Sequence, residues 1–94
     1  MIQPTLPILL ALTLVAGCSG IVADRAIVNG TGPELLKLRT GPGLDYGVVR
    51  GLPDGTELNR YDCVTEIGQL WCEVSPVDAA GVRGWVSADY LSGG

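Results

Sequence analysis

The sequence predicts an all-β fold in the form of one small barrel, on three observations. The 94 residues include 14 glycines and no phenylalanine, and Val, Leu and turn-forming residues alternate along most of the chain, which is typical of a β-barrel. No segment has the length or the 3.6-residue periodicity of a stable helix. The part of the chain after residue 17 is long enough for one small core and no second domain.

The expected strands follow one another along the chain, each ending at a turn. In the first, Leu36 and Leu38 alternate with other residues and should face the core. The sequence Pro-Asp-Gly at residues 53–55 is a strong turn signal and should separate the second strand from the third. The predicted strands are 35–39, 48–52, 56–61, 70–74 and 82–87. The predicted connections include loops at 41–47 and 75–81 and a 3₁₀ turn at 88–91.

Two short blocks of the sequence have the pattern of a strand that runs into a tight turn. Residues 36–43 are LKLRTGPG, and residues 84–91 are GWVSADYL. Together they resemble the first and last segments of a bacterial SH3 (SH3b) domain, and the similarity runs from residue 34 to residue 91. The resemblance implies an SH3-like barrel of about five to six strands at residues 34–94. It also implies a domain that binds a partner rather than one that catalyses a reaction.

The N-terminus carries an uncharged, mostly apolar run at residues 8–17. This run is too short to cross a bilayer, which takes about 20 helical residues, but it has the length of a signal-peptide core. Residues 15–18 (VAGC) resemble a lipobox, in which the cysteine is lipidated and becomes the mature N-terminus. We therefore expect a signal peptide at 1–17, lipid on Cys18, and a linker over 18–33.

One feature departs from the lipoprotein pattern, because residues 1–7 contain no Lys or Arg. A plain secretory signal and an uncleaved apolar N-terminus are the alternatives. Resemblance to other lipoproteins implies that Ser19 directs the protein to the outer membrane, with the domain facing the periplasm. Within the linker, residues 29–33 are rich in turn formers, whereas residues 26–28 (AIV) are apolar enough to pair as an edge strand.

Cys63 and Cys72 remain as an even pair if Cys18 takes lipid, and an even pair in an exported chain predicts a disulfide. A two- or four-residue loop centred on residues 67–68 would place Cys63 opposite Cys72. A three-residue loop would shift the register by one residue and oppose Cys63 to Trp71. Two reduced core cysteines are the remaining alternative. Two cysteines without a histidine cannot complete a tetrahedral zinc site.

Charge and composition exclude several classes of function. The net charge is −4, and all charged residues follow Cys18, so we expect no binding to nucleic acid or to anionic lipid through charge. The chain has no histidine, which removes Ser-His-Asp and Cys-His catalysis. Most carboxylates fall in turns, where Asp and Glu are turn formers or solvated. We expect no enzymatic activity, no cofactor and no metal.

The aromatic residues are the candidates for a ligand-binding surface, because rigid rings supply apolar contact at small entropic cost. They are Tyr46, Tyr61, Trp71, Trp85 and Tyr90. By resemblance, the 41–47 loop corresponds to the RT loop and borders the same groove as the 3₁₀ turn, which places Tyr46 and Tyr90 together. Trp71 is expected on the same face, and Trp85 in or against the barrel.

Charged residues near these aromatics would select the polar groups of a ligand. We expect Asp45, Arg39 and Arg50 in this role. Aromatic faces flanked by carboxylates and arginines suit fragments of peptidoglycan, either wall peptide or glycan. The alternatives are an adaptor that docks an envelope protein on the groove or on a sheet edge, and a structural accessory lipoprotein without a ligand. The aromatics would then only complete a core that lacks Phe.

Overall fold

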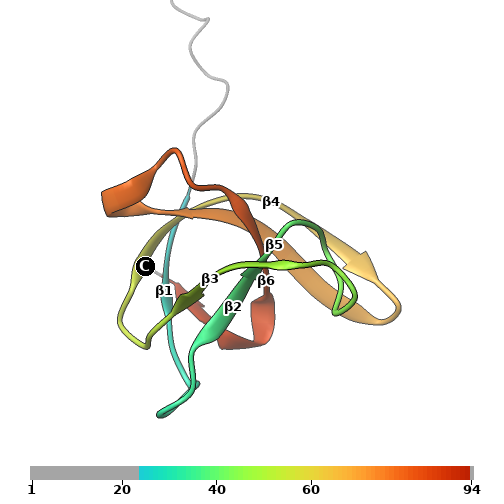
Figure 1. The fold of residues 1–94 in the computed structure, drawn as a ribbon, viewed down its shortest axis with the longest axis horizontal. Helices are drawn as coiled ribbons and strands as arrows, with labels where there is room; N and C mark the ends of the chain where they lie inside the picture. The colour runs from blue at the N-terminus through green and yellow to red at the C-terminus, as the bar shows by residue number, and fades with distance from the viewer. Residues whose placement is uncertain (1–23, 94) are drawn as a thin grey trace, which may run out of the picture.

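Seven antiparallel strands form one curled sheet in the computed structural model, which describes residues 24–93 (Figure 1). The strands are β1 (Asp24–Val28), β2 (Leu36–Arg39), β3 (Val48–Leu52), β4 (Glu57–Glu66), β5 (Gln69–Pro76), β6 (Gly84–Ser87) and β7 (Leu91–Gly93). Two 3₁₀ turns, η2 (Val77–Ala79) and η3 (Ala88–Tyr90), connect β5 to β6 and β6 to β7. The order across the sheet is β3-β2-β6-β5-β4-β1-β7.

The predicted all-β class is confirmed, with two strands beyond the five in the sequence pattern. The prediction left residues 26–28 as a possible edge strand, but β1 pairs with β4 on one side and β7 on the other. The reason is apolar burial, because Ala26 and Val28 are each only 1% exposed. The sheet therefore extends ten residues upstream of the predicted start at Glu34, into the expected linker. The predicted signal peptide and Cys18 lie outside the described residues.

The central core cluster within residues 24–93 consists of aliphatic side chains and one cysteine from six strands. Leu36 and Leu38 face it as predicted. The core residues are Val28, Leu36, Leu38, Leu52, Leu58, Cys72, Val74 and Val86. Because side chains alternate along a strand, Trp71 in β5 and Trp85 in β6 lie on the face opposite this core cluster. Trp71 is itself buried, at 5% exposed, so it packs outside this cluster on the other face of β5.

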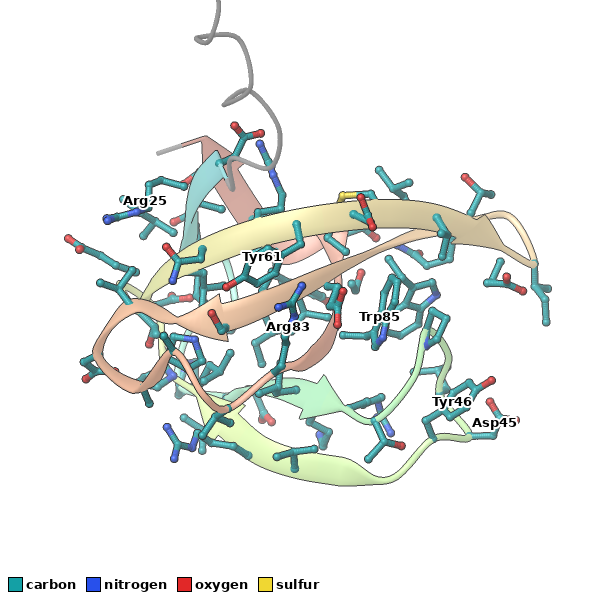
Figure 2. The ribbon with its side chains drawn as sticks, turned by 90° about the horizontal axis from the view of Figure 1, so that it is seen from above. Arg25, Asp45, Tyr46, Tyr61, Arg83 and Trp85 are labelled. Atoms are coloured by element: carbon teal, nitrogen blue, oxygen red, sulfur yellow. A yellow bond between two sulfur atoms is a disulfide. The ribbon has the colours of Figure 1, made fainter. Side chains whose placement is uncertain are left out.

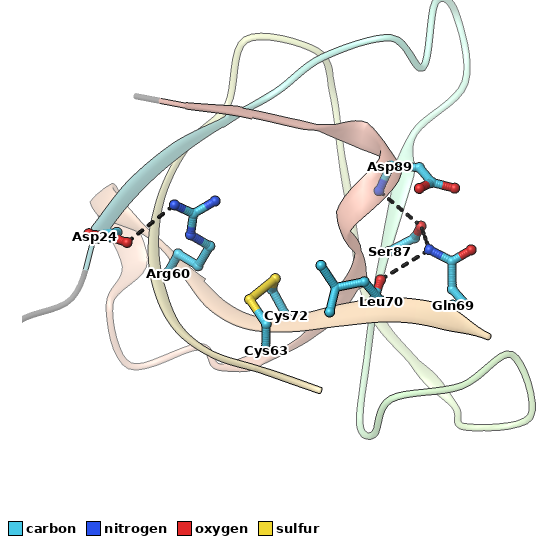
Figure 3. Close-up of a disulfide and its surroundings, with 8 residues drawn as sticks. All are labelled: Asp24, Arg60, Cys63, Gln69, Leu70, Cys72, Ser87 and Asp89. Atoms are coloured by element: carbon cyan, nitrogen blue, oxygen red, sulfur yellow. Dashed lines mark hydrogen bonds and ion pairs between the residues drawn. A yellow bond between two sulfur atoms is a disulfide. The ribbon is translucent and has the colours of Figure 1, made fainter. Parts of the chain in front are cut away.

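A two-residue turn joins β4 to β5 and sets the cysteine register. Ile67 and Gly68 have φ values of 51° and 76°, and Glu66 pairs with Gln69, which together fit a type I′ hairpin. Cys63 lies opposite Cys72 in this register, and a disulfide joins them (Figure 3). The two-residue alternative is therefore correct, and the three-residue loop that would oppose Cys63 to Trp71 is wrong.

The strands that border the site approach each other closely at Gly84. A Cβ atom on Gly84 would lie 2.6 Å from the carbonyl oxygen of Arg39 and 2.9 Å from Cγ of Leu38. Only glycine lets β6 pack this tightly on β2. This explains the glycine in the Gly-Trp-Val segment and brings Arg39 opposite Trp85 in the ladder. The loop predicted at 75–81 is shorter than expected, since Ser75 and Pro76 belong to β5.

Candidate functional site

The 41–47 loop is held in place by the strand that precedes it. The guanidinium Nη1 of Arg39 donates hydrogen bonds to the carbonyl oxygens of Leu44, at 3.0 Å, and Tyr46, at 2.9 Å. The backbone N–H of Thr40 closes the loop on the carbonyl of Gly47 at 2.9 Å. The ring of Tyr46 lies against Gly41, where a Cβ atom would clash with the ring carbons. Arg39 therefore fixes the loop that presents Leu44.

The η3 turn is fixed by a small network of hydrogen bonds around Ser87. The Ser87 hydroxyl accepts from the backbone N–H of Asp89 at 3.3 Å and from Nε2 of Gln69 at 3.0 Å (Figure 3). Gln69 Nε2 also donates to the carbonyl of Leu70 at 3.0 Å. Both bonds use the amide nitrogen of Gln69. Its carboxamide oxygen therefore points outward and can accept a hydrogen bond. The network positions Asp89 and Tyr90 beside the β4–β5 hairpin.

The tip of the β4–β5 hairpin exposes an apolar side chain on a residue with an unfavourable backbone conformation. Ile67 is 102% exposed, and its φ of 51° is in the left-handed region. A β-branched residue is an outlier there, and the left-handed backbone costs an L-residue roughly 1–2 kcal/mol. Type I′ turns usually have Asn or Gly at this position. The tip therefore exposes an isoleucine where a polar residue would suit the backbone better.

These three segments enclose one end of a groove that consists of two hollows. The first hollow, of about 310 Å³, lies between residues 30–39 and Tyr90. The second, of about 520 Å³, lies between the 41–47 loop, the β4–β5 hairpin and η3. Four residues line both hollows and form the centre of the groove: Leu44, Trp71, Ser87 and Tyr90.

The centre of the groove combines a buried floor with exposed walls. Trp71 is 5% exposed and forms the floor, whereas Leu44 is 78% exposed and Tyr90 40% exposed. Apolar side chains that are solvated around a fixed indole are the arrangement of a binding site rather than of a packed core. The groove therefore offers a rigid apolar surface for a ligand.

The structure brings together four of the predicted ligand residues. Trp71 and Tyr90 line both hollows, Arg39 lines the first, and Asp45 lines the second. Arg39 is already engaged with the loop carbonyls, so its main role is to position the loop.

Three other predicted residues lie outside the linings of both hollows: Tyr46, Trp85 and Arg50. In Figure 2, Asp45 and Tyr46 share the loop at one end of the domain, and Trp85 lies between that loop and the middle of the sheet. Arg50 is exposed in β3.

Glu66, Ile67 and Gln69 line the second hollow from the tip of the β4–β5 hairpin, which was not expected at the site. Leu44 and Asp89 also line it, and they lie in the 41–47 loop and the 88–91 turn that were expected there, although neither residue was singled out. The isoleucine in a turn is the one signal in the sequence that points to the hairpin tip. The rest could not be found because the hairpin tip and the 41–47 loop are far apart in the chain. They meet only when the sheet curls.

The two hollows differ in charge. The charged residues that line the second hollow are all carboxylates: Asp45, Glu66 and Asp89. The first is lined by Lys37 and Arg39 together with Glu34. The groove is therefore polarised along its length, acidic at the hairpin end and more basic at the β2 end. No group of three or more metal-binding side chains occurs in residues 24–93.

One wall of the first hollow is fastened by Asp54. Its carboxylate accepts hydrogen bonds from the backbone N–H of Thr31 at 2.9 Å, the Thr31 hydroxyl at 2.7 Å and the backbone N–H of Gly32 at 3.1 Å. These bonds stabilise the charged form and lower the pKa of Asp54 below its ordinary value of 3.8. The β3–β4 turn thereby holds the 29–33 segment against the groove.

A polar cluster lies away from the groove, and its side chains bond to one another. The guanidinium of Arg83 lies 3.7 Å from the centre of the Tyr61 ring (Figure 2), and it pairs with Glu73 at 3.1 Å. The Tyr61 hydroxyl is hydrogen-bonded to the buried Ser75 at 2.8 Å. Because the arginine covers the ring, Tyr61 offers little free aromatic surface. It serves the structure of the sheet.

A curled antiparallel sheet with a groove between an RT-like loop, a hairpin tip and a 3₁₀ turn defines a small β-barrel binding module of the SH3 type. The comparison with protein families agrees, since a model described as bacterial SH3 domain matches residues 34–92, more than half of the chain. The protein belongs to the bacterial SH3 domain family, a family of binding domains. No curated protein and no solved structure gave a significant match.

Proposed function

We propose that this protein is an envelope-facing binding module that recognises peptidoglycan fragments in the groove between the 41–47 loop and the β4–β5 hairpin. One observation carries the proposal: Leu44 and Tyr90 stand solvated around the fixed indole of Trp71. The groove also supplies carboxylates beside the apolar surface. Such a mixture suits short peptides and amino sugars, which have both apolar and polar faces.

The test is co-sedimentation of the full-length protein, solubilised in detergent, with purified peptidoglycan sacculi. We expect the protein to pellet with sacculi, and soluble muropeptides in excess should release it. Replacing Tyr90 by Ala should reduce the pelleted fraction, because the substitution removes an aromatic wall of the groove. Failure to pellet, or pelleting that muropeptides do not compete with, would contradict the proposal.

A lipid anchor on Cys18 is part of the same proposal and rests on the sequence VAGC at residues 15–18. It would hold the domain at a membrane, the outer membrane in a Gram-negative envelope. Mass spectrometry of the mature protein should find an acylated N-terminal Cys18. A soluble mature form that begins at another residue would contradict the anchor and leave wall binding to be judged by the sacculus experiment.

A protein partner is the second candidate, and a separate observation favours it. β3 is an edge strand, and Val48 and Val49 in it are both about half exposed. An edge with exposed valines can accept a further strand from another protein. Cross-linking in intact cells would then yield one envelope protein attached at β3, and the sacculus experiment would be negative.

A further inference from the structure

The acidic hollow has a polar lining that favours one kind of ligand group. Its charged side chains are the carboxylates of Asp45, Glu66 and Asp89. Figure 3 shows the Asp89 carboxylate and the carboxamide oxygen of Gln69 directed to the same side, away from the disulfide. The amide nitrogen of Gln69 is used by Ser87 and Leu70. Carboxylates and a carboxamide oxygen all accept hydrogen bonds, so a ligand group here must donate them.

The apolar part of the same hollow indicates what the rest of the ligand group should be. Pro42, Leu44, Ile67, Trp71 and Tyr90 line it together with the acceptors. An aliphatic chain can lie along such a surface while its charged end reaches the carboxylates. A primary ammonium on a short methylene stem meets both requirements. A carboxylate or phosphate group would be repelled.

The other hollow has the opposite preference at its β2 side. Lys37 is exposed there, and its ammonium favours an anionic group. The two hollows join at Leu44, Trp71, Ser87 and Tyr90. The groove therefore matches a short ligand with an ammonium at one end and a carboxylate at the other.

We infer that the acidic hollow binds the side-chain ammonium of the diamino acid in a wall stem peptide, with the peptide's carboxylates directed toward Lys37. This inference rests on the proposed function and specifies its ligand. Among wall fragments, the stem peptide combines free carboxylates with an aliphatic amine, whereas the glycan strand has no such amine. Charge complementarity along the groove thus selects the peptide over the glycan.

The experiment compares two synthetic stem tetrapeptides that carry lysine as the diamino acid, one with a free ε-amine and one with that amine acetylated. Acetylation removes the charge and keeps the stem. Binding to the full-length protein in detergent is measured by calorimetry at low and high salt. We expect the free amine to bind roughly five- to tenfold more tightly, and salt to reduce this difference, because exposed ion pairs are individually weak and screened.

Charge-neutralising variants locate the effect. The double variant Glu66→Gln with Asp89→Asn should lose most of the preference for the free amine. Asp78→Asn is the matched control, because Asp78 is exposed in η2 and lines neither hollow. It should leave the preference unchanged. Amide chemical shifts of the double variant should match the wild type outside the groove, which confirms that the variant is folded.

The outcomes separate the ligand assignment from the proposed function. Equal binding of the two peptides, or equal loss of preference in Asp78→Asn, overturns the ammonium assignment while wall binding stands. If neither peptide binds but glycan chains free of peptide do, the ligand is glycan and the assignment is wrong. If no wall fragment binds and a lysine-containing segment of an envelope protein does, both the assignment and the proposed function fail.

Discussion

Nη1 of Arg39 lies 3.0 Å from the carbonyl oxygen of Leu44, and this bond places the most exposed residue of the groove centre. The same nitrogen reaches the carbonyl of Tyr46 at 2.9 Å. A guanidinium that bridges two carbonyls on one loop acts on the loop's shape. Arg39 is therefore a positioning residue, although the sequence suggested that it would contact the ligand.

Replacing Arg39 by Ala should loosen the 41–47 loop and weaken muropeptide binding. Hydrogen bonds from a charged donor contribute about 1.5–3 kcal/mol when shielded, and partial exposure reduces this, so we expect a loss of about 1 kcal/mol in binding. Hydrogen exchange should show faster exchange of the Thr40 amide. Arg50→Ala, in β3 and outside both hollows, is the control. Equal effects of the two variants would contradict the positioning role.

Replacing Tyr90 by Ala should weaken ligand binding by roughly 1–3 kcal/mol without unfolding the domain. Tyr90 is 40% exposed and lines both hollows, so its loss removes contact area rather than core packing. Affinity is measured by titrating muropeptides and following amide shifts. Tyr61→Ala should leave affinity unchanged, because Arg83 covers that ring. Shifts confined to the 53–55 turn or to residues 75–81 would show that the ligand binds elsewhere.

Replacing Ile67 by Asn should make the domain more stable and its binding weaker. Asn tolerates the left-handed backbone that Ile67 occupies at φ 51°, and removing the mismatch should stabilise the hairpin by about 1 kcal/mol. The same change removes an apolar wall of the acidic hollow. Chemical denaturation and calorimetry measure the two effects. A gain in stability with unchanged affinity would show that the exposed isoleucine has no part in binding.

Replacing both Cys63 and Cys72 by Ser should lower the free energy of unfolding by about 2–4 kcal/mol. The disulfide closes a sequence separation of nine residues in a domain whose core is small and aliphatic. Denaturant titration of wild type and variant under oxidising conditions measures the difference. Reductant should destabilise the wild type and have no effect on the variant. Identical midpoints would mean that the cross-link contributes nothing.

Low pH should weaken the hydrogen bonds between Asp54 and Thr31. The folded state lowers the pKa of Asp54 because the Thr31 hydroxyl and the Thr31 and Gly32 amides bond its charged form. Its contribution to stability is therefore complete above the unfolded pKa, near 3.8, and is lost as the pH falls through the lower folded value. The melting temperature of Asp54→Asn should accordingly approach that of the wild type below this range. A constant difference down to pH 2 would contradict the assignment.

Local sequence patterns located five of the seven strands and two of the core leucines. Alternation of Leu36 and Leu38, the Pro-Asp-Gly turn at 53–55 and the segment ending in Gly-Trp-Val are local patterns, and the structure places a strand or turn at each. Periodicity predicted these strands because every second residue of a strand points to the same face, so a buried face shows as an apolar residue at every second position. It also narrowed the cysteine register to two alternatives. It could not choose between them, since the choice depended on whether Ile67 would accept a left-handed backbone.

Resemblance placed the 41–47 loop, Trp71 and the 88–91 turn on one face, whereas the part of the β4–β5 hairpin tip in the groove became visible only in the folded chain. Leu44, Ile67 and Asp89 lie on three separate segments, and no local pattern links them. They meet because the seven-stranded sheet curls, and because Gly84 lets β6 approach β2 closely enough to bring η3 beside the 41–47 loop. The same curl leaves Trp85 and Tyr46 outside both hollows, although their sequence context resembled that of ligand residues. A binding surface made from loop tips is set by long-range packing, which sequence spacing does not record.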